Sequence, residues 1–549
     1  MTGPEPEAEV DAELDAEPDP GAASAWAPLR IRIFRWLWIA SLASNVGTFM
    51  HNVGASWLMT DLTRSPTLIS LLQTVYSAPG FLLALPAGAL ADVVDRKRLL
   101  VASQGFMLAV ATMMGVLTVT DRITTTWLLV LTFLLSVGGT VNMPVWTSVT
   151  PEVVPRDELP QAVALNSISS NLAQSVGPAV AGVLIAAAGS GAVFLVNAAS
   201  FVGVVVVVSS WKRDAPVTTL PAEHVRSAIV TGLRFARHSP PLLVLLGRLA
   251  LFVAFSSSLA ALLPLLARSR LRVTAGGFGL LEASIGVGAV ALASVLPRLR
   301  KALGPDGVML AGAVAYGAGL GVVAWSGSLA VAVPGLLVVG AATIAVMTMV
   351  FATLQGILPA WVRGRGLAVA MLVVWLVTSP AAYGWGALAQ RVGVSTALTV
   401  AAIGCAIVGV AVARPLRIGR FADIDITPVP PSTPIVACPP APLDGPVLVN
   451  VEWVIDPASV EAFTAAMAPI RLRRRRDGAV SWGLFEDVGR PGRMLESFTV
   501  ASWAEHVRQH GRAVAADVAA EAAAHAFLVD GPPVVTHLVA AGRRTSRRG

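Results

Sequence analysis

Apolar segments of about twenty residues recur along most of this chain, and this feature restricts its fold more than any other. A helix needs about 20 mostly apolar residues to cross the hydrocarbon core of a bilayer. We therefore expect membrane spans at roughly 34–60, 67–91, 98–119, 126–149, 161–188, 191–210, 241–267, 275–297, 308–326, 329–354, 367–388 and 394–413. The pattern predicts an all-α polytopic membrane protein with twelve transmembrane helices in two halves of six.

The composition agrees with a membrane protein. Of the 549 residues, 55% are hydrophobic and 13% are charged, whereas soluble domains carry about 25% charged residues. The formal charge of +7 is typical of cytoplasmic Lys and Arg in membrane proteins, so we expect no nucleic-acid partner. The lipid bilayer is the expected surrounding of the spans.

The distribution of cations predicts the orientation. If the N-terminus is inside, most Lys and Arg residues near span ends are cytoplasmic, as the positive-inside rule requires. We therefore expect a multi-pass protein of the inner (plasma) membrane with both termini in the cytoplasm. Residues 1–29 form an acidic, Ala- and Pro-rich stretch without the features of a signal peptide, and we expect a disordered tail there.

These patterns divide the chain into six parts. After the N-terminal tail we expect a six-helix half at 30–210, a cytoplasmic connector at 211–240 and a second six-helix half at 241–420. A proline-rich linker follows at 421–446, and its composition predicts a stiff, extended segment. A soluble domain occupies 447–549.

The loop between the second and third spans reads Gly88-Ala-Leu-Ala-Asp92-Val-Val-Asp95-Arg96-Lys97-Arg98. It is similar to the signature loop Gly-x-Leu-Ala-Asp-Arg-x-Gly-Arg-Lys of the major facilitator superfamily, with Val93 and Asp95 as departures. The resemblance implies a gating role for Gly88, Asp92, Arg96 and Lys97. Gly88 would permit close helix contact, and Arg96 would pair with an acidic group across the cytoplasmic gate. The alternative is an ordinary turn that obeys the positive-inside rule.

The fifth span contains Gly177-Pro178-Ala-Val-Ala-Gly182, and a proline recurs at Pro380 at the matching station of the second half. The first motif is similar to part of Gly-Pro-x-x-Gly-Gly in exporters of this superfamily, which favours efflux. It resembles the exporter-like branch, with enterobactin-exporter-type proteins among its members. Pro178 would bend the helix, and the small residues would let helices approach. A role in packing alone is the alternative.

Three ionisable residues are expected inside the spans, where a buried charge normally marks function or pairing. For Arg248, structural pairing and substrate contact have equal weight. Glu282 is the carboxylate best placed to take up a proton, or else it lies at the interface. His51 fits a packing role better than a functional one.

Further polar and aromatic residues in the spans are candidates for the pathway of substrate or ion. They are Asn45, Gln73, Asn142, Asn171, Gln174, Trp375 and Tyr383. We expect a secondary exporter of a small amphipathic molecule, such as a siderophore, antibiotic or drug, that works by alternating access with proton coupling. No Walker phosphate-binding loop occurs, and we expect no cofactor, metal or catalytic residue.

The C-terminal region predicts a small α+β domain. Strands at 447–454, 479–486, 493–500 and 533–540 alternate with helices at 458–471 and 502–524, an order that indicates a ferredoxin-like fold. The domain resembles antibiotic-biosynthesis-type monooxygenases. In an alternative hypothesis this tail oxidises or modifies the transported compound. His506 and His510 lie one turn apart, and we expect them to be solvated rather than to bind a metal.

Two further expectations concern the surface of the tail. The basic run Arg471–Arg476 either meets anionic lipid or ends a solvated helix. A homodimer is expected through the sheet face that carries Val449, Val451, Trp453, Trp482, Leu484 and Phe498.

Overall fold

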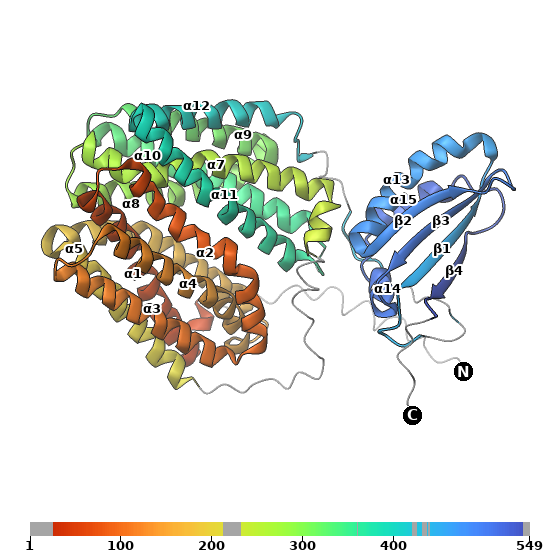
Figure 1. Ribbon diagram of the computed structural model, residues 1–549, viewed down its shortest axis with the longest axis horizontal. Coiled ribbons are helices and arrows are strands. Elements are labelled where there is room, and N and C mark those ends of the chain that lie inside the picture. Colours follow the sequence, from red (N-terminus) through yellow and green to blue (C-terminus); the bar gives the residue numbers. More distant parts are fainter. Residues whose placement is uncertain are drawn as a thin grey trace, which may run out of the picture.

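The structure is a computed structural model that describes residues 26–211, 232–359, 361–419, 425–430, 436 and 440–541. Long helices form one bundle, and a small sheet with its own helices follows it (Figure 1). The expected acidic tail lies outside the described residues up to residue 25, and a short 3-10 turn, η1 (Ala27–Arg30), precedes the first long helix. Most of the expected connector also lies outside them, apart from a helical turn at 232–237.

Eleven long helices make up most of the described part of the bundle. The first half contains α1 (Arg32–Leu62), α2 (Pro66–Val93), α3 (Arg96–Val119), α4 (Thr125–Val153) and α5 (Leu159–Ser210). The second half contains α7 (Pro240–Ser269), α8 (Ala275–Ala293), α9 (Leu296–Trp325), α10 (Leu329–Ile357), α11 (Arg363–Val392) and α12 (Val394–Ala413). Most ends lie within a few residues of those expected from hydropathy.

Helix α9 begins earlier than expected, at Leu296 instead of residue 308. Its first turns carry Arg298, Arg300 and Lys301, so the span expected from hydropathy did not include these turns. Gly304 has φ +67 inside this helix, a conformation that glycine adopts without a steric penalty. The charged first part of α9 is therefore set at an angle to its apolar part.

Ten helices of the described part are long and apolar enough to cross a membrane. Helix α1 is not among the ten, and α5 counts once although it has 52 residues. A straight helix of that length would measure roughly 78 Å, more than twice the hydrocarbon thickness. Gly189 has φ +78 and interrupts the helical backbone, so α5 consists of two arms, one before and one after this residue.

Successive connections of the bundle lie at alternating ends. We call the end that holds the α1–α2, α7–α8 and α11–α12 connections the distal end. The opposite, proximal end holds the α2–α3 and α10–α11 connections and the exit of α12 toward the tail. These names refer to the fold and not to the sides of a membrane.

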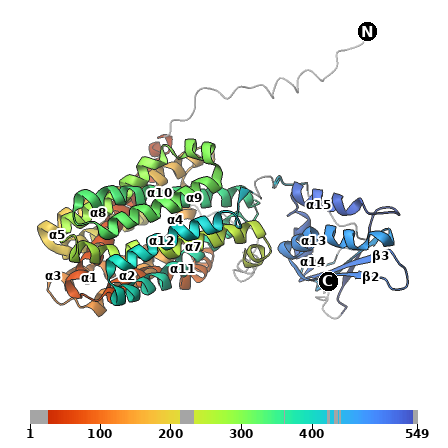
Figure 2. The same cartoon turned by 90° about the horizontal axis from the view of Figure 1, so that it is seen from above.

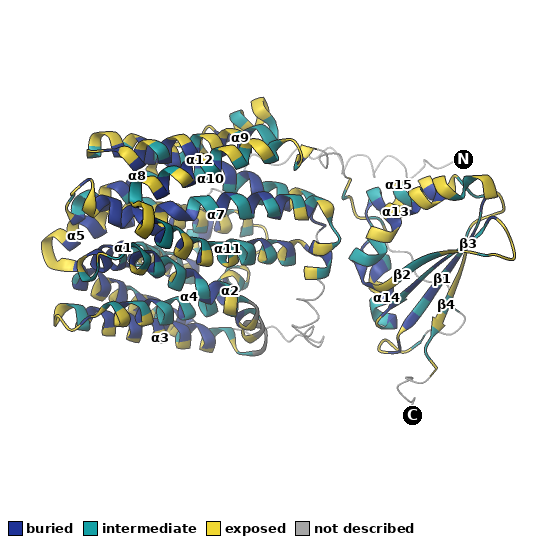
Figure 3. Cartoon of the chain, turned by 45° about the horizontal axis from the view of Figure 1, so that its top comes forward, coloured by how far each residue is buried: buried dark blue, intermediate teal, exposed yellow. Residues whose placement is uncertain are grey.

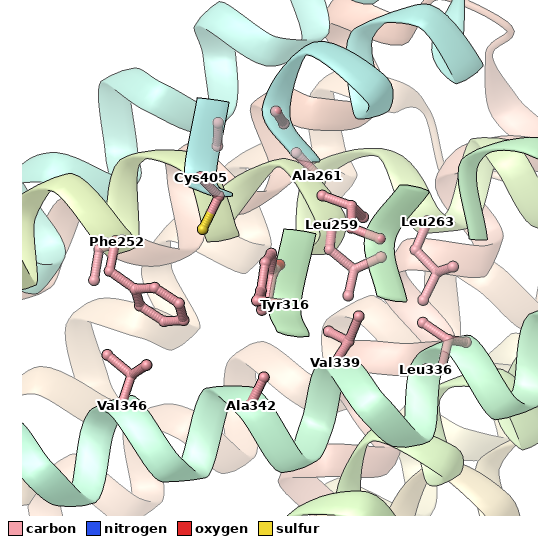
Figure 4. Packing of buried hydrophobic residues seen from close by; sticks show 14 of the residues in the cluster. Phe252, Leu259, Ala261, Leu263, Tyr316, Leu336, Val339, Ala342, Val346 and Cys405 are labelled. Atoms are coloured by element: carbon pink, nitrogen blue, oxygen red, sulfur yellow. The ribbon is translucent and has the colours of Figure 1, made fainter. Parts of the chain in front are cut away.

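Apolar side chains fill the space between the helices. Buried surfaces face the interior, and exposed ones lie outside (Figure 3). In the second half, Tyr316 of α9 meets Phe252 of α7 edge to face at 5.3 Å between ring centroids. The Tyr316 hydroxyl donates to the carbonyl of Ser256, and Val346 and Cys405 line the same cluster (Figure 4). A buried phenol that keeps a hydrogen bond costs little.

The tail forms a four-stranded antiparallel sheet in the order β2-β3-β1-β4. Its elements are β1 (Val447–Val454), η3 (Pro457–Ser459), α13 (Val460–Asp477), β2 (Ala479–Glu486), β3 (Arg493–Val500), α14 (Trp503–His510), α15 (Ala515–His525) and β4 (Val534–Val539). Helices α13 and α15 lie on one side of the sheet (Figure 2). The prediction of a single helix at 502–524 is wrong. The chain leaves helical geometry after Gly511, and Val514 forms an isolated β-bridge with Pro428.

Part of the expected linker pairs with the tail. The amide of Val429 donates to the carbonyl of Ala513, and the amide of Ala515 donates to that of Thr427. Residues 425–430 are therefore attached to the domain rather than free spacers. The linker residues 420–424, 431–435 and 437–439 lie outside the described part.

The apolar sheet face expected to mediate dimerisation is covered within the chain. Val449, Trp482 and Phe498 are aligned across neighbouring strands, and this face packs against the helices. The Trp453 ring lies 5.5 Å from that of Phe463 in α13. The opposite face carries polar pairs instead, such as the ion pair between Arg493 and Glu452. These apolar residues therefore belong to the core of the tail.

The basic run at the end of α13 is not a free cationic surface. Arg473 pairs with Glu521, Arg474 with Glu496, and Arg476 with both Asp477 and Asp517. The expectation of a lipid-binding or solvated run is wrong for these three residues. Their charges instead connect α13 to β3 and α15.

Candidate functional site

The signature loop of the first half lies at the proximal end and joins three helices. Arg96, the first residue of α3, forms an ion pair with Glu152 near the end of α4 at 2.5 Å. Lys97 donates to the carbonyls of Ser209 and Trp211, where α5 ends. A cation at free carbonyls stabilises a helix C-terminus. The Arg96 pair therefore lies within one half, not across a gate between halves.

The other two candidate residues of the loop are Asp92 and Gly88. The side chain of Asp92 lies outside the described part of the chain. No described atom lies within 4 Å of the place where a Cβ on Gly88 would stand. The expected close helix contact at Gly88 is thus absent among the described residues in this conformation.

The second half has a related charged cluster at the same end. Arg248 of α7 is buried and pairs with Asp306 of α9. Asp306 also accepts from the amides of Ile418 and Gly419, which follow α12. Structural pairing therefore accounts for Arg248. In the first half the start of α3 is thus connected to the end of α5, and in the second half the start of the apolar part of α9 is connected to the segment after α12.

The two halves meet through polar contacts at the distal end. Asp61 at the end of α1 accepts a hydrogen bond from Arg268 at the end of α7 at 2.6 Å. The Arg268 guanidinium lies 5.0 Å from the centroid of the Trp57 ring, and Trp57 stacks on Phe278 of α8 at 5.5 Å. We call these four residues the distal latch. They connect α1 of the first half to α7 and α8 of the second.

Helices α2 and α11 form another contact between the halves. Near the distal end, the Thr67 hydroxyl donates to Oε1 of Gln390 at 2.5 Å. About two turns further in, Thr74 donates to the carbonyl of Ser379. Deeper still, Trp375 covers Gly80, where a Cβ would come within 2.5 Å of the indole. The candidate residue Trp375 therefore lies at the interface of the halves.

The glycine and proline motif of α5 lies at a third contact. A Cβ on Gly182 would meet the carbonyl oxygen of Ala275 at 3.0 Å, and a Cβ on Gly279 of α8 would meet that of Pro178 at 2.6 Å. On the other side of α5, Gly177 packs against Phe49 of α1. The small residues thus allow α5 to approach α8 and α1 closely.

Several polar candidates of the first half interact within that half. Asn142 of α4 accepts from Ser103 and Gln104 of α3 at 3.3 Å. Asn45 of α1 donates weakly to Ser169 of α5 at 3.4 Å. Asn142 and Asn45 thus stabilise contacts between helices.

The remaining candidates are distributed over different surroundings. His51 is buried against Phe194 at 4.7 Å between ring centroids, which agrees with a packing role. Gln73 and Glu282 are partly buried. Exposed candidates are Asn171, Gln174, Pro380 and Tyr383. The structure therefore does not gather all candidates around one point.

Sequence reasoning missed most residues that join the halves. Asp61, Trp57, Phe278, Thr67 and Gln390 stand at helix ends or on helix faces without a motif. An acidic and a basic residue at two helix ends on the same side of the bundle are the only sequence signal for the latch.

Comparison with known proteins agrees with this architecture. The family model described as transmembrane secretion effector (MFS_3) matches residues 23–545, which includes the tail. The chain is 30% identical over 208 residues to the uncharacterized MFS-type transporter YfiS of Bacillus subtilis, covering 36% of this chain and 48% of that protein. It is 24% identical over 262 residues to the staphyloferrin A transporter of Staphylococcus aureus, covering 47% of this chain and 65% of that protein.

A third relative is the enterobactin exporter EntS of Salmonella typhi, with 27% identity over 289 residues, 51% of this chain and 67% of that protein. The matched region thus spans about half to two thirds of the length of these relatives. A bacterial homolog of the human lysosomal transporter Spinster has the same fold, with a TM-score of 0.59 at 14% identity over 72% of this chain and 97% of that chain. The chain therefore belongs to the transmembrane secretion effector family of the major facilitator superfamily.

Proposed function

We propose that this protein is a secondary active exporter of a small amphipathic metabolite that works by alternating access. In this proposal it has twelve membrane spans, because α1 and both arms of α5 cross the bilayer in addition to the other apolar helices. The two halves are the units that move relative to each other.

The distal latch is the observation that carries this proposal. Alternating access requires contacts between the halves that exist in one conformation and break in the other. Asp61 and Arg268 are both partly exposed, with side-chain accessibilities of 40% and 46%. Such pairs contribute only about 0–1 kcal/mol. A contact of this strength can hold one state without preventing the transition.

The direction and the substrate class rest on the relatives and on the α5 motif. The family description names secretion, and one relative is named an enterobactin exporter. A siderophore, antibiotic or drug of similar amphipathic character is the proposed cargo. Trp375 and Tyr383 provide aromatic surface on α11 for such a molecule.

Proton coupling is the proposed source of energy, and Glu282 is the proposed carrier. It is the carboxylate of α8, a helix that packs directly against α5 of the other half. A carboxylate inside a membrane span is costly and normally functional. Protonation of Glu282 would therefore change the charge at the interface of the halves.

We also propose that both termini lie in the cytoplasm of a cell with the protein in its inner membrane, following the distribution of Lys and Arg. The proximal end would then be the cytoplasmic end. The tail would be a ferredoxin-like domain, as its order β2-β3-β1-β4 favours.

A deletion strain tests the function most directly. Metabolites in cells and medium would be compared by mass spectrometry for the deletion strain and for strains complemented with the wild type, Glu282→Gln or Asp121→Asn. We expect an amphipathic compound to accumulate in cells of the deletion and Glu282→Gln strains only. Asp121 lies in the α3–α4 turn at φ +55, where Asn is tolerated, so it is the matched control. Equal metabolite distributions in all strains would refute export.

A further inference from the structure

The proximal end of the second half carries positive charge that the proposed transport cycle does not use. Residues 241–420 contain only two carboxylates, Glu282 and Asp306. Glu282 lies in the distal part of α8, and Asp306 is already bound by Arg248 and by two amides after α12. The other cations at this end therefore have no carboxylate of their own half as a partner.

Four of these cations are exposed, and they lie on two neighbouring helices. They are Arg298, Arg300 and Lys301 in the first turns of α9 and Arg414 directly after α12, and we call them the α9–α12 basic patch. Among the described residues, none of the four has an ion pair or a side-chain hydrogen bond. At the matching station of the first half, by contrast, Arg96 pairs with Glu152 and Lys97 binds carbonyls at the end of α5. The patch is thus available to an anionic partner.

Helices α9 and α12 lie side by side (Figure 1). A Cβ on Gly409 of α12 would come within 2.6 Å of the Cβ of Ala313 in α9. Since α9 begins at the proximal end and α12 ends there, this register places Arg414 beside the start of the apolar part of α9, next to the bend at Gly304. The α9–α12 basic patch therefore occupies one corner of the proximal end.

The length of α12 sets the level of this corner in a bilayer. The helix has 20 residues, which corresponds to about 30 Å, the thickness of the hydrocarbon core. Arg414 directly follows its last residue. When α12 spans a membrane, the Arg414 guanidinium consequently lies at the level of the lipid headgroups.

One face of α12 continues from Arg414 into the hydrocarbon region. Val400, Ile403, Ile407 and Val410 are 46–61% exposed. Their spacing of three and four residues places them on one side of the helix, and Arg414 follows Val410 by four residues. This side of α12 thus offers apolar contact for an acyl chain next to a cation for its headgroup.

The first turns of α9 have a similar division. Leu299 and Leu303 are four residues apart and share one side of the helix, and Leu303 is 50% exposed. Arg298 and Lys301, three residues apart, lie on the other side. A helix with separate apolar and cationic sides favours the membrane interface, where the cations meet the headgroups. The bend at Gly304 sets these turns at an angle to the span, as such a position requires.

We propose that the α9–α12 basic patch is a binding site for an anionic phospholipid. Its guanidinium and ammonium groups donate to the lipid phosphate, and one acyl chain lies along the exposed side of α12 between Ile403 and Val410. Each Lys or Arg near the surface strengthens the binding of anionic lipid. Phosphatidylcholine is disfavoured, because its headgroup brings a cation of its own. The site lies apart from the distal latch and does not depend on the direction of transport.

Native mass spectrometry of the full chain in detergent, titrated with dioleoylphosphatidylglycerol or dioleoylphosphatidylcholine, tests this site. We expect the first phosphatidylglycerol to bind at least tenfold more tightly than phosphatidylcholine. Arg298→Gln combined with Lys301→Gln, and Arg414→Gln alone, should weaken phosphatidylglycerol binding about fivefold for each cation removed. The control, Arg64→Gln with Arg272→Gln, removes two exposed cations from distal connections and should bind like the wild type.

Thermal unfolding in phosphatidylcholine shows whether each variant has kept its fold. If the folded patch variants bind phosphatidylglycerol as tightly as the wild type, or if the control loses as much affinity as they do, the proposal is wrong. Glycerol 1-phosphate, a headgroup without acyl chains, should not displace the lipid at equal concentration. Displacement would identify a site for free phosphate esters and would overturn the lipid assignment.

The acidic stretch at the N-terminus is the rival partner for the patch. A chain without residues 2–25 should bind phosphatidylglycerol with unchanged affinity. A gain of tenfold or more in this truncated chain would show that the acidic stretch occupies the patch, and the proposal would then be wrong. None of these results affects the proposed export function, which the deletion strain tests separately.

Discussion

The guanidinium carbon of Arg512 in the tail lies 4.6 Å from the centroid of the Trp361 ring in the α10–α11 connection. Two further contacts accompany this pair. Arg234 donates to the carbonyl of Gly478 at 3.0 Å, and Arg476 lies 5.8 Å from the ring of Phe235. Phe235 and Trp361 also meet edge to face. The tail therefore contacts the bundle at its proximal end, beside the connection of α10 to α11.

We expect Trp361→Leu to loosen the tail. A cation–π contact contributes about 0.5–2 kcal/mol, depending on its burial, so the docked fraction should fall severalfold. Limited proteolysis of the linker, followed over time in nanodiscs, measures this directly. Trp325→Leu at the distal end removes an exposed tryptophan that makes another cation–π contact, with Arg270, and should leave the cleavage rate unchanged. Equal rates in all three proteins would show that Trp361 does not hold the tail.

The distal latch makes a second prediction. Asp61→Asn should reduce the occupancy of the distally closed state by up to about fivefold, because partly exposed ion pairs contribute about 0–1 kcal/mol. The distance between spin labels at the α1–α2 and α7–α8 connections would report this change. The charge swap Asp61→Arg with Arg268→Asp should restore the wild-type distribution. A swap that behaves like the single variants would argue against a direct pair.

The contact of α5 with α8 leads to a third prediction. Gly279→Val should destabilise the bundle by about 1–3 kcal/mol through overpacking, because a Cβ would come within 2.6 Å of the Pro178 carbonyl. The yield of monodisperse protein in size-exclusion chromatography should fall. Gly203→Ala is the control, since no atom lies within 4 Å of its added Cβ. If Gly279→Val behaved like this control, the close approach would not contribute to stability.

Local patterns account for what the sequence could predict. The bounds of α12, β2 and β3 agree with those expected at 394–413, 479–486 and 493–500, because apolar length and alternation are properties of neighbouring residues. The prediction of a major facilitator transporter is confirmed by the family match. Contacts between the halves are different in kind. Asp61 and Arg268 are 207 residues apart, and only the packing of two halves brings them together.

The tail illustrates the same limit. His506 was expected to be solvated, yet it is 2% exposed. Its burial depends on the break after Gly511 and on the strand β4, which places His537 against it at 4.8 Å. Neither feature is visible in the helical spacing of residues 502–524. The sequence thus predicted the elements of the tail but not the packing around His506.

A homodimer of the tail remains a prediction, and the structure changes the face that would carry it. The outer sheet face exposes Phe485, Val534 and Leu538 beside the polar pairs. We expect a weak dimer through this face that Val534→Arg abolishes. Sedimentation of the full chain in detergent, with Val488→Arg as control, would measure it. A wild-type protein that stays monomeric at high micromolar concentration would refute the dimer.

Three histidines of the tail, His506, His510 and His537, allow us to predict how the stability of the tail depends on pH. Burial lowers the pKa of His506 from 6.5 to about 4 and also lowers those of His510 and His537. Below pH 6.5 the unfolded tail therefore binds protons that the folded tail does not, so the contribution of these histidines to the free energy of unfolding falls as pH decreases from 6.5 toward 4 and does not change above this range. The melting temperature of the tail in the full chain, measured between pH 7.5 and 4.5, should show this decline. His506→Gln keeps a polar side chain without a titrating ring and should have a flatter profile. If the variant and the wild type lose stability in parallel, other groups are responsible for the decline.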